Sequence, residues 1–156
     1  MSLIFRMIWL LIAARFKPRL PHIKPYNELN MMVFPNDLDI NMHMNNGRYL
    51  TICDLNRVDM FIRSGLARTM LKQKWMPIIT EHTMIYRKAL KPFQKYRVTM
   101  KVTGWDDRAF DMAHEFLVGD RLVAEGTSKG VIYSKKDGVI PPQKVMDTVE
   151  RSIKHD

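Results

Sequence analysis

The stretch Asp37-Leu-Asp-Ile-Asn-Met-His-Met-Asn-Asn-Gly-Arg-Tyr49 places carboxylate, amide and imidazole side chains directly before a segment with helical periodicity. Apolar residues then recur at three- and four-residue steps, which predicts a helix from Gly47 to about Leu66 with one buried face. The first N–H groups of a helix have no intrahelical partner and carry partial positive charge. The stretch therefore predicts a hydrolytic site, in which acid–base side chains lie beside donors for an oxyanion.

Segments on either side of this helix have the pattern of strands. In residues 96–103 apolar and polar side chains alternate, which is typical of a strand with one buried face. A similar run at 28–34 precedes the helix, and runs at 75–87, 110–116 and 122–133 follow it, so four strands joined by short antiparallel turns are expected after the helix. Gly126 and Gly130 indicate a bulge or a close backbone approach in the last strand, and Pro141 and Pro142 begin a final helix. The order predicts an α+β domain in which a long helix packs on a curved antiparallel sheet.

Composition limits the class of protein. The 156 residues, 46% hydrophobic and 26% charged, predict an N-terminal segment (1–25) and one globular domain (26–156). The single cysteine, Cys53, excludes an internal disulfide framework, and no Cys/His spacing is typical of zinc, so we expect a cytoplasmic protein without metal or cofactor. The net charge of +9 suits an anionic ligand, such as the phosphates of coenzyme A (CoA) or an acidic carrier protein. No basic stripe interleaved with aromatics indicates nucleic acid.

Residues 3–16 are strongly apolar, and Pro18 and Pro21 end any helix there. Such a helix would be about 21 Å long, which is short of the roughly 30 Å hydrocarbon core of a bilayer. Ile12 does not fit the small-residue pattern of a signal-peptide cleavage site. Two alternatives remain: a helix that lies on a membrane surface, giving peripheral membrane contact, or a helix docked on a partner subunit.

With these residues the chain resembles the hotdog-fold thioesterases over about residues 26–140. The 4-hydroxybenzoyl-CoA thioesterase-like enzymes carry an Asp, then Gly-His-Val-Asn-Asn and a Tyr, which Asp39, residues 42–46 and Tyr49 match. The plant acyl-carrier-protein (ACP) thioesterases carry Asp-Leu-Asp-Val-Asn-Gln-His-Val-Asn-Asn, which is similar to residues 37–46. The chain is also similar to the group called thioesterase superfamily member six. The resemblance implies a hotdog fold, in which a curved antiparallel sheet wraps a central helix.

The resemblance also implies roles for individual residues. Asp39 would be the nucleophile or general base, and Asn41 and His43 would be supporting polar catalytic residues. The backbone N–H groups expected to polarise the thioester carbonyl are those of Asn45, Asn46 and Gly47. Tyr49 and Asp54 are further candidates for support, although an i,i+3 pair with Arg57 explains Asp54 equally well.

Two positions depart from the family pattern, and several residues have structural interpretations. Met42 stands where the first branch has Gly, and Ala89 stands where the plant branch has a catalytic Glu. Asn45 or Asn46 could serve as a helix cap, and His43 alone would be read as a hydrogen-bonded structural residue. The remaining polar or reactive residues are interpreted as a turn residue, two strand histidines and a core thiol: Asp37, His82, His114 and Cys53.

The leading hypothesis is an acyl thioesterase that hydrolyses acyl-CoA or acyl-ACP thioesters, with a fatty acyl group favoured by the many Met, Phe and Leu residues. The resemblance implies a homodimer, or a dimer of dimers, with clefts at the subunit interface. The rival is a non-catalytic hotdog protein that binds acyl chains or acts as a membrane-associated scaffold, and Met42 and Ala89 support it. A hotdog dehydratase is the weaker enzymatic rival, because the His and Glu or Asp arrangement expected for it is missing.

Overall fold

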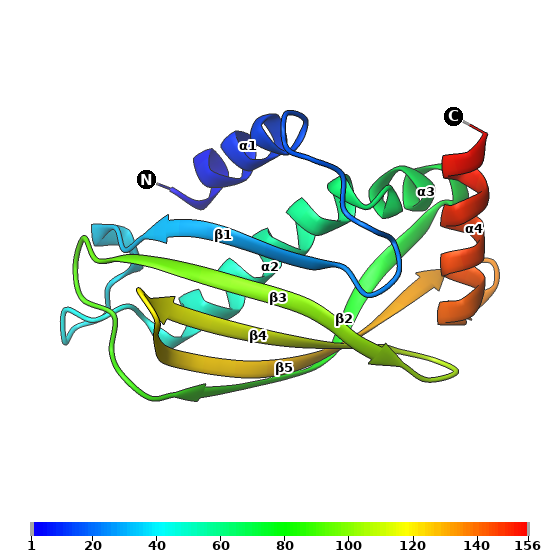
Figure 1. Cartoon of the computed structure of the whole chain (residues 1–156). Coiled ribbons are helices and arrows are strands. Elements are labelled where there is room, and N and C mark those ends of the chain that lie inside the picture. The colour runs from blue at the N-terminus through cyan, green and yellow to red at the C-terminus, as the bar shows by residue number, and fades with distance from the viewer. Residues whose placement is uncertain (1, 156) are drawn as a thin grey trace.

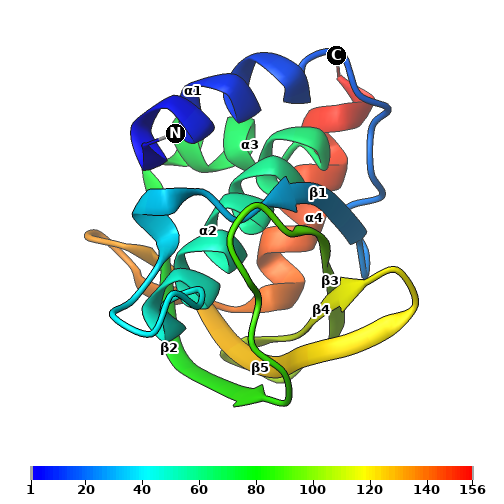
Figure 2. The same ribbon diagram turned by 90° about the vertical axis from the view of Figure 1, so that its left-hand side faces the viewer.

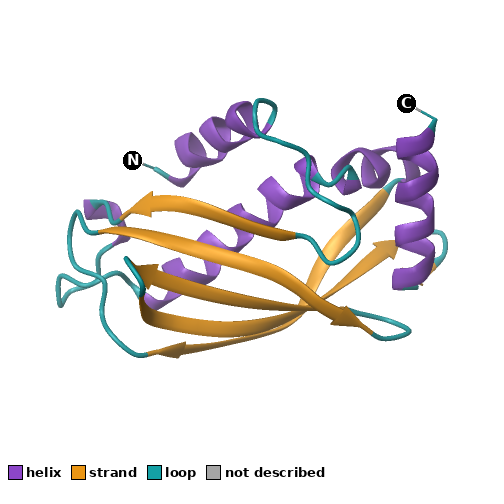
Figure 3. Ribbon diagram, in the orientation of Figure 1, coloured by secondary structure: helices purple, strands orange, loops and turns teal. Residues whose placement is uncertain are grey.

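The computed structural model describes residues 2–155 and shows one antiparallel sheet curled around a long helix (Figures 1 and 3). The sheet order is β1 (Tyr26–Met32), β3 (Lys95–Trp105), β4 (Phe110–Val118), β5 (Arg121–Ser134), β2 (Trp75–Tyr86), with β6 (Gly138–Ile140) paired to β5. The helices are α1 (Leu3–Ala14), α2 (Asn46–Arg63), α3 (Leu66–Gln73) and α4 (Pro142–Lys154). Viewed from the end, the sheet curls around α2 (Figure 2). The α+β hotdog architecture expected from the sequence is confirmed.

Helix α2 lies in the core because side chains around most of its circumference are apolar or find buried polar partners. Ile52, Cys53 and Leu55 are fully buried in the same cluster as Phe116 and Val98 of the sheet. Burying a side chain of this size contributes about 1.5–3 kcal/mol. The sheet covers one side of α2 and α1 packs on another, so the start of α2 is held in place at the edge of the core (Figures 1 and 2).

The end of α2 and the segment after it differ from the sequence-based expectation. The helix predicted to run to Leu66 ends at Arg63, because Gly65 adopts a left-handed conformation (φ 83°) that closes one helix and begins the next. Helix α3 was not predicted. The expected close backbone approach at Gly126 is confirmed, since a Cβ there would lie 2.1 Å from the carbonyl oxygen of Thr83.

The connection between β2 and β3 also differs from the expectation of four strands joined by short antiparallel turns. Short turns join β3, β4 and β5, but residues 87–94 carry the chain from β2 across the sheet to β3. Strand β2 pairs with β5 on one side and forms the edge of the sheet. Its last residue, Tyr86, donates a hydrogen bond through its hydroxyl to the carbonyl oxygen of Asn46 at 3.1 Å. An open edge strand therefore ends beside the start of α2.

Helix α1 packs its inner face on the rest of the same chain. Arg6, Leu10 and Ala14 are buried, and Arg6 forms an ion pair with Asp37 at 2.5 Å. The following linker is held to the end of α2, where Nε of Arg63 donates to the carbonyl oxygen of Pro18 at 2.8 Å. The outer face stays exposed and apolar, with Ile4, Phe5, Ile8, Trp9, Leu11 and Ile12. None of the helices within residues 2–155 has the length and apolar character that crossing a bilayer requires.

Candidate active site

The loop before α2 is a closed turn built around the carboxylate of Asp39. Its Oδ1 accepts hydrogen bonds from the backbone N–H groups of Asn41 (2.8 Å) and His43 (3.2 Å). The N–H of Asp39 donates back to the carbonyl oxygen of His43 at 2.8 Å. The second carboxylate oxygen, Oδ2, accepts no hydrogen bond from the part of the chain that the structure describes. Asp39 therefore shapes the loop with one oxygen and leaves the other available.

The loop is fixed to the core at its ends. The side chain of Met44 is buried, and its N–H donates to the carbonyl oxygen of Leu90 at 2.9 Å. Leu38 and Met44 form a β-bridge across the base of the turn. Met42 at the tip has a φ of 60°, which lies in the left-handed region that favours Gly. The 4-hydroxybenzoyl-CoA thioesterase-like pattern has Gly at this position. The backbone thus keeps a conformation that suits Gly although the side chain differs.

The start of α2 leaves one amide donor unused. Asn45 is the N-cap, and its Oδ1 accepts from the N–H of Gly47 at 2.8 Å, so the capping interpretation is confirmed for Asn45. The N–H of Asn45 donates to the carbonyl oxygen of Asp37 at 2.8 Å. Within residues 2–155, the N–H of Asn46 donates to no group. Of the three amides expected to polarise a carbonyl, that of Asn46 is therefore the available one.

The structure places the other predicted site residues in different surroundings. Asn41 and His43 lie on the same loop as Asp39 with exposed side chains. Tyr49 is buried in the core, with its ring centroid 5.0 Å from that of Tyr86 and 4.9 Å from that of Phe116. Asp54 is exposed on α2 and pairs with Arg57. Loop and helix start thus come together at one surface, while Tyr49 belongs to the packing beneath it.

Asp37 does more than make a turn. It lies in the 3-10 turn Pro35–Asp37, where Oδ2 accepts the N–H of Phe34 at 2.9 Å. Its carboxylate is only 1% exposed, and it pairs with Arg6 at 2.5 Å and Arg48 at 3.3 Å. Two ion pairs and a capping hydrogen bond thus hold the base of the loop. The sequence offered one signal for this role, namely a carboxylate three residues after the cap position.

A second polar cluster lies between α2 and the sheet, and the sequence did not predict it. Nη2 of Arg57 lies 3.5 Å from Nδ1 of His82 and 3.5 Å from Nε2 of His114. The hydroxyl oxygen of Ser128 is 2.7 Å from the same Nε2. A guanidinium can only donate, so both imidazoles accept and are neutral. Burial, followed by the charge of Arg57, lowers the pKa of His114 to about 3 and also lowers the pKa of His82.

Cys53 joins this cluster, and the three residues have the donor types of a soft-metal site. Ligand atoms of Cys53, His82 and His114 lie within 4.8 Å of one another. The guanidinium of Arg57 beside both imidazoles opposes a further cation, and burial raises the pKa of the Cys53 thiol to about 12. The arrangement therefore favours a hydrogen-bonded core cluster over a metal centre.

Comparison with known proteins identifies similar chains. Residues 33–149 match the family described as the thioesterase-like superfamily. The protein THEM6 of Xenopus laevis is 31% identical over 106 residues, which cover 68% of this chain and 51% of that protein. This chain thus spans about half the length of that relative.

Solved structures share the fold at low sequence identity. The YbaW probable thioesterase of Escherichia coli aligns with a TM-score of 0.73 and 16% identity, over 80% of this chain and 96% of that one. The protein SAV2348 of Staphylococcus aureus, solved in complex with CoA, aligns with a TM-score of 0.69 and 14% identity, over 83% of this chain and 84% of that one. These similarities establish a shared architecture around the central helix.

Proposed function

Because the chain belongs to the thioesterase-like superfamily, we propose that it is an acyl thioesterase that hydrolyses acyl-CoA or acyl-ACP thioesters, with fatty acyl groups favoured. The observation that carries the proposal is the unused N–H of Asn46 at the start of α2, directly after a loop whose carboxylate keeps one oxygen available. An oxyanion donor and a base or nucleophile are the two groups that thioester hydrolysis requires.

The chemistry needs few groups because a thiolate is a good leaving group. In the general-base route, Asp39 takes a proton from water while the water oxygen bonds to the thioester carbonyl carbon. The carbonyl oxygen gains negative charge and accepts a hydrogen bond from the N–H of Asn46. One such donor stabilises the transition state by about 3–4 kcal/mol. The tetrahedral intermediate then collapses, the C–S bond breaks, and the thiolate takes the proton. In the nucleophilic route, Asp39 attacks the carbonyl carbon, the C–S bond breaks and the thiolate leaves. Water then hydrolyses the mixed anhydride to the free acid and Asp39, and the proton released goes to the thiolate.

Asn41 and His43 are proposed as supporting residues on the same loop. Their backbone N–H groups bind Oδ1 of Asp39, and their side chains extend into solvent on the surface where a substrate would approach. Either side chain can hydrogen-bond the attacking water, and His43 can pass a proton to the departing thiolate. Because the loop lies at the surface of one chain, a second chain would have to enclose the substrate.

We propose that this second chain is a copy paired along the open edge of β2. The strand is 12 residues long, and within residues 2–155 no strand pairs with its outer edge. Met76, Ile78 and Ile85 on β2 expose apolar surface. A long edge strand of this kind is a template for pairing, and a two-fold axis would make the pairing antiparallel. Association of two such dimers would give the dimer of dimers that remains an alternative.

Thiol release from a panel of acyl-CoAs and acyl-ACPs of different chain length tests the activity. Asp39→Asn removes the charge but keeps an oxygen that accepts the loop N–H groups, so the rate should fall by roughly 10²–10⁴-fold without loss of the fold. Asp107→Asn, in an exposed turn, is the matched control and should leave the rate unchanged. A wild-type protein no faster than the Asp39 variant would defeat the proposal and favour a non-catalytic acyl-binding protein or scaffold.

We also propose that the outer face of α1 makes peripheral contact with a membrane. Arg6 is buried and Lys17 pairs with Asp59, so the basic residues that remain for anionic lipid are Arg15 and Arg19, which follow the exposed Trp9 in the chain. The wild-type protein should sediment with phosphatidylserine-containing vesicles, and Phe5→Ser/Trp9→Ser should not. Binding that the double substitution leaves intact would contradict the proposal. A change in oligomeric state, without vesicle binding, would assign this face to a partner subunit.

A further inference from the structure

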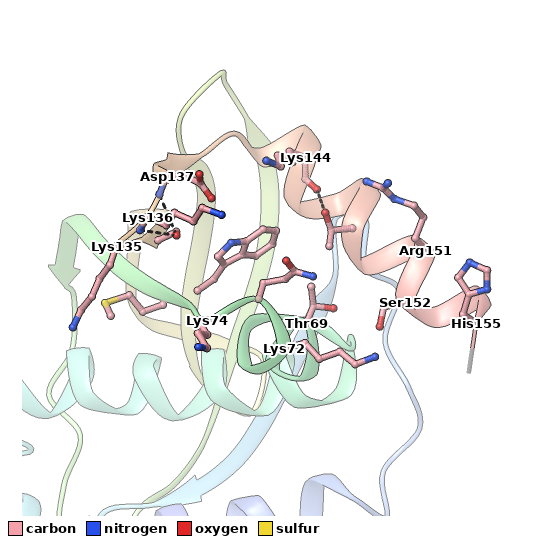
Figure 4. Close-up of a pocket in the computed structure, with 15 residues that line it drawn as sticks. Thr69, Lys72, Lys74, Lys135, Lys136, Asp137, Lys144, Arg151, Ser152 and His155 are labelled. Atoms are coloured by element: carbon pink, nitrogen blue, oxygen red, sulfur yellow. Dashed lines mark hydrogen bonds between the residues drawn. The ribbon is translucent and has the colours of Figure 1, made fainter.

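A basic cleft lies at the end of the molecule opposite to the Asp39 loop. Helix α3, the β5–β6 turn and helix α4 surround a cavity of about 980 Å³ (Figure 4). It is lined by six cationic side chains, those of Lys72, Lys74, Lys135, Lys136, Lys144 and Arg151. One carboxylate, that of Asp137, lines it as well. Figure 4 shows Lys135 and Lys136 on one side of the cleft and Lys144 and Arg151 on the other.

These cations are available for a ligand. Within residues 2–155 none of the six forms a side-chain ion pair, whereas several other cations of the chain do. Trp75 and Met76 add apolar surface to the wall, and Ser152 adds a hydroxyl group. A concave site of this size, with cations that form no ion pair and a hydroxyl donor, suits a small ligand that carries several phosphate groups. A flat membrane surface would not reach into it.

The backbone that carries the cleft lysines is fixed. The hydroxyl oxygen of Ser134 accepts the N–H groups of Lys136 (3.2 Å) and Asp137 (3.3 Å), which closes the β5–β6 turn. Lys74 caps α3 in a left-handed conformation (φ 58°) immediately before β2. Elements from three parts of the chain therefore place these lysines around one cavity before any ligand arrives, so binding requires little ordering of the backbone.

The cleft lies at the start of β2, and in an antiparallel pair of β2 strands this places it next to the Asp39 loop of another copy. In one chain the cleft adjoins Trp75 at the start of β2, whereas the start of α2 adjoins Tyr86 at the end of that strand. Helix α2 separates the two sites by about 27 Å, the length of 18 residues of α-helix. In an antiparallel pair of β2 strands, the end of one lies beside the start of the other. The cleft of one copy then adjoins the Asp39 loop of its partner.

We propose that the basic cleft binds the nucleotide phosphates of a CoA-type thioester whose acyl group is hydrolysed at the Asp39 loop of the partner copy. The inference rests on the proposed thioesterase function and names its carrier group: a small phosphorylated molecule in place of an acidic carrier protein. The cleft cations hold the phosphates, and the thiol arm extends across the interface to the loop. Specificity for the carrier thus resides in one copy and chemistry in the other.

Binding of free CoA by isothermal titration calorimetry tests the cleft without requiring catalysis. Lys72→Glu/Lys136→Glu/Lys144→Glu changes one exposed lysine on each of the three surrounding elements and should weaken CoA binding at least about tenfold. Lys91→Glu/Lys101→Glu reverses exposed lysines outside the cleft and should leave binding within about twofold. 3′-Dephospho-CoA and pyrophosphate should compete with CoA for the cleft, and the competitor with more phosphate charge should compete more strongly. CoA affinity unchanged by the triple substitution would overturn the proposal.

Mixing subunits tests whether the cleft serves the Asp39 loop of its own chain or that of its partner. Asp39→Asn subunits keep an intact cleft, and the triple-lysine subunits keep an intact loop, so each homodimer should be inactive at low acyl-CoA concentration. After mixing in equal amounts and exchange, half of the dimers are mixed, and each has one complete site if the cleft acts on its partner. Activity should return to about a quarter of the wild-type rate. Activity that does not return, in mixtures shown to contain mixed dimers, would contradict action across the interface.

The outcomes separate this inference from the proposed function. CoA binding that depends on the cleft lysines, in a protein that releases no thiol, would refute the enzyme and retain the cleft. Thiol release from acyl-CoA that the triple substitution does not change would retain the enzyme and refute the cleft. Hydrolysis of acyl-ACP alone, lost in the triple variant, would assign the cleft to an acidic carrier protein and refute the phosphate proposal.

Discussion

Asp37 and Asp39 are two residues apart in the sequence and have opposite surroundings. Asp37 is buried, pairs with Arg6 and Arg48, and holds the base of the loop. Asp39 is half-buried, has no ion pair within residues 2–155, and binds only backbone N–H groups of its own loop. One carboxylate connects helix α1 to the domain, and the other remains available for chemistry. The same side chain is therefore structural or reactive according to burial and partners.

The same contrast divides the polar side chains of the whole molecule. Buried polar groups beneath α2, including the cluster of Arg57 with two histidines, have partners in the core and should determine stability. Exposed polar groups before α2 should determine activity with little effect on stability. Substitutions that separate stability from activity therefore assign each side chain to the buried set or the exposed set.

The largest effect is expected when the buried ion pair is broken. Asp37→Ala leaves the guanidinium of Arg6 buried without a carboxylate, which should lower the free energy of unfolding by about 3–5 kcal/mol. The double variant Arg6→Met/Asp37→Leu removes both charges and should recover much of this loss. Urea unfolding followed by circular dichroism measures both values. A loss below about 1 kcal/mol for Asp37→Ala would mean that α1 is not held by this pair.

Acid should destabilise the protein through the buried imidazole of His114. His114 has an unfolded pKa near 6.5 and a folded pKa of about 3, so the unfolded state binds more protons between these values. The stabilisation is complete above pH 6.5 and is lost as the pH falls towards 3, by about 1.4 kcal/mol per pH unit for one proton. His114→Leu should reduce the slope of the unfolding free energy against pH in this window by about 1.4 kcal/mol per pH unit, the contribution of one proton. An unchanged slope would show that His114 is protonated in the folded state.

Substitutions at Asp39 should have a small effect on stability. Asp39→Asn keeps the acceptor for the N–H groups of Asn41 and His43, so the free energy of unfolding should change by less than about 1 kcal/mol. Asp39→Ala removes both hydrogen bonds and should cost about 1–2 kcal/mol. Equal losses for both variants in thermal unfolding would contradict the assignment of the carboxylate oxygen to the loop. A larger loss than that of Asp37→Ala would reverse the comparison.

Most of the fold and part of the site followed from the sequence. Periodicity located α2, β3 and β4, because local alternation directly reflects which face is buried. The loop before α2 was recognised because its acid, amide and imidazole side chains fall within the ten residues 37–46. The pairing of β2 with β5 was missed, because residues 87–94 carry no pattern that distinguishes a crossover from a turn.

The polar contacts within the core could not be predicted, because they join residues far apart in the sequence. Arg6 and Asp37 are 31 positions apart, and Arg57 and His114 are 57 apart. Arg6 lies in an apolar helix, and charged residues are seldom buried unless paired, so its burial could be foreseen only together with its partner. The sequence alone did not identify its partner.

The smallest effect concerns Met42, whose backbone is in the left-handed region while its side chain is exposed. A residue other than Gly costs roughly 1–2 kcal/mol in that region, whereas Gly adds conformational entropy to the unfolded chain. Met42→Gly should therefore stabilise the protein by less than about 1 kcal/mol and leave thiol release within about twofold. Ile40→Gly, at an exposed position of the same loop without positive φ, should instead destabilise by a similar amount. If Met42→Gly destabilises as much as Ile40→Gly, the Met42 side chain contributes to the loop and the exposed set is not free of structural roles.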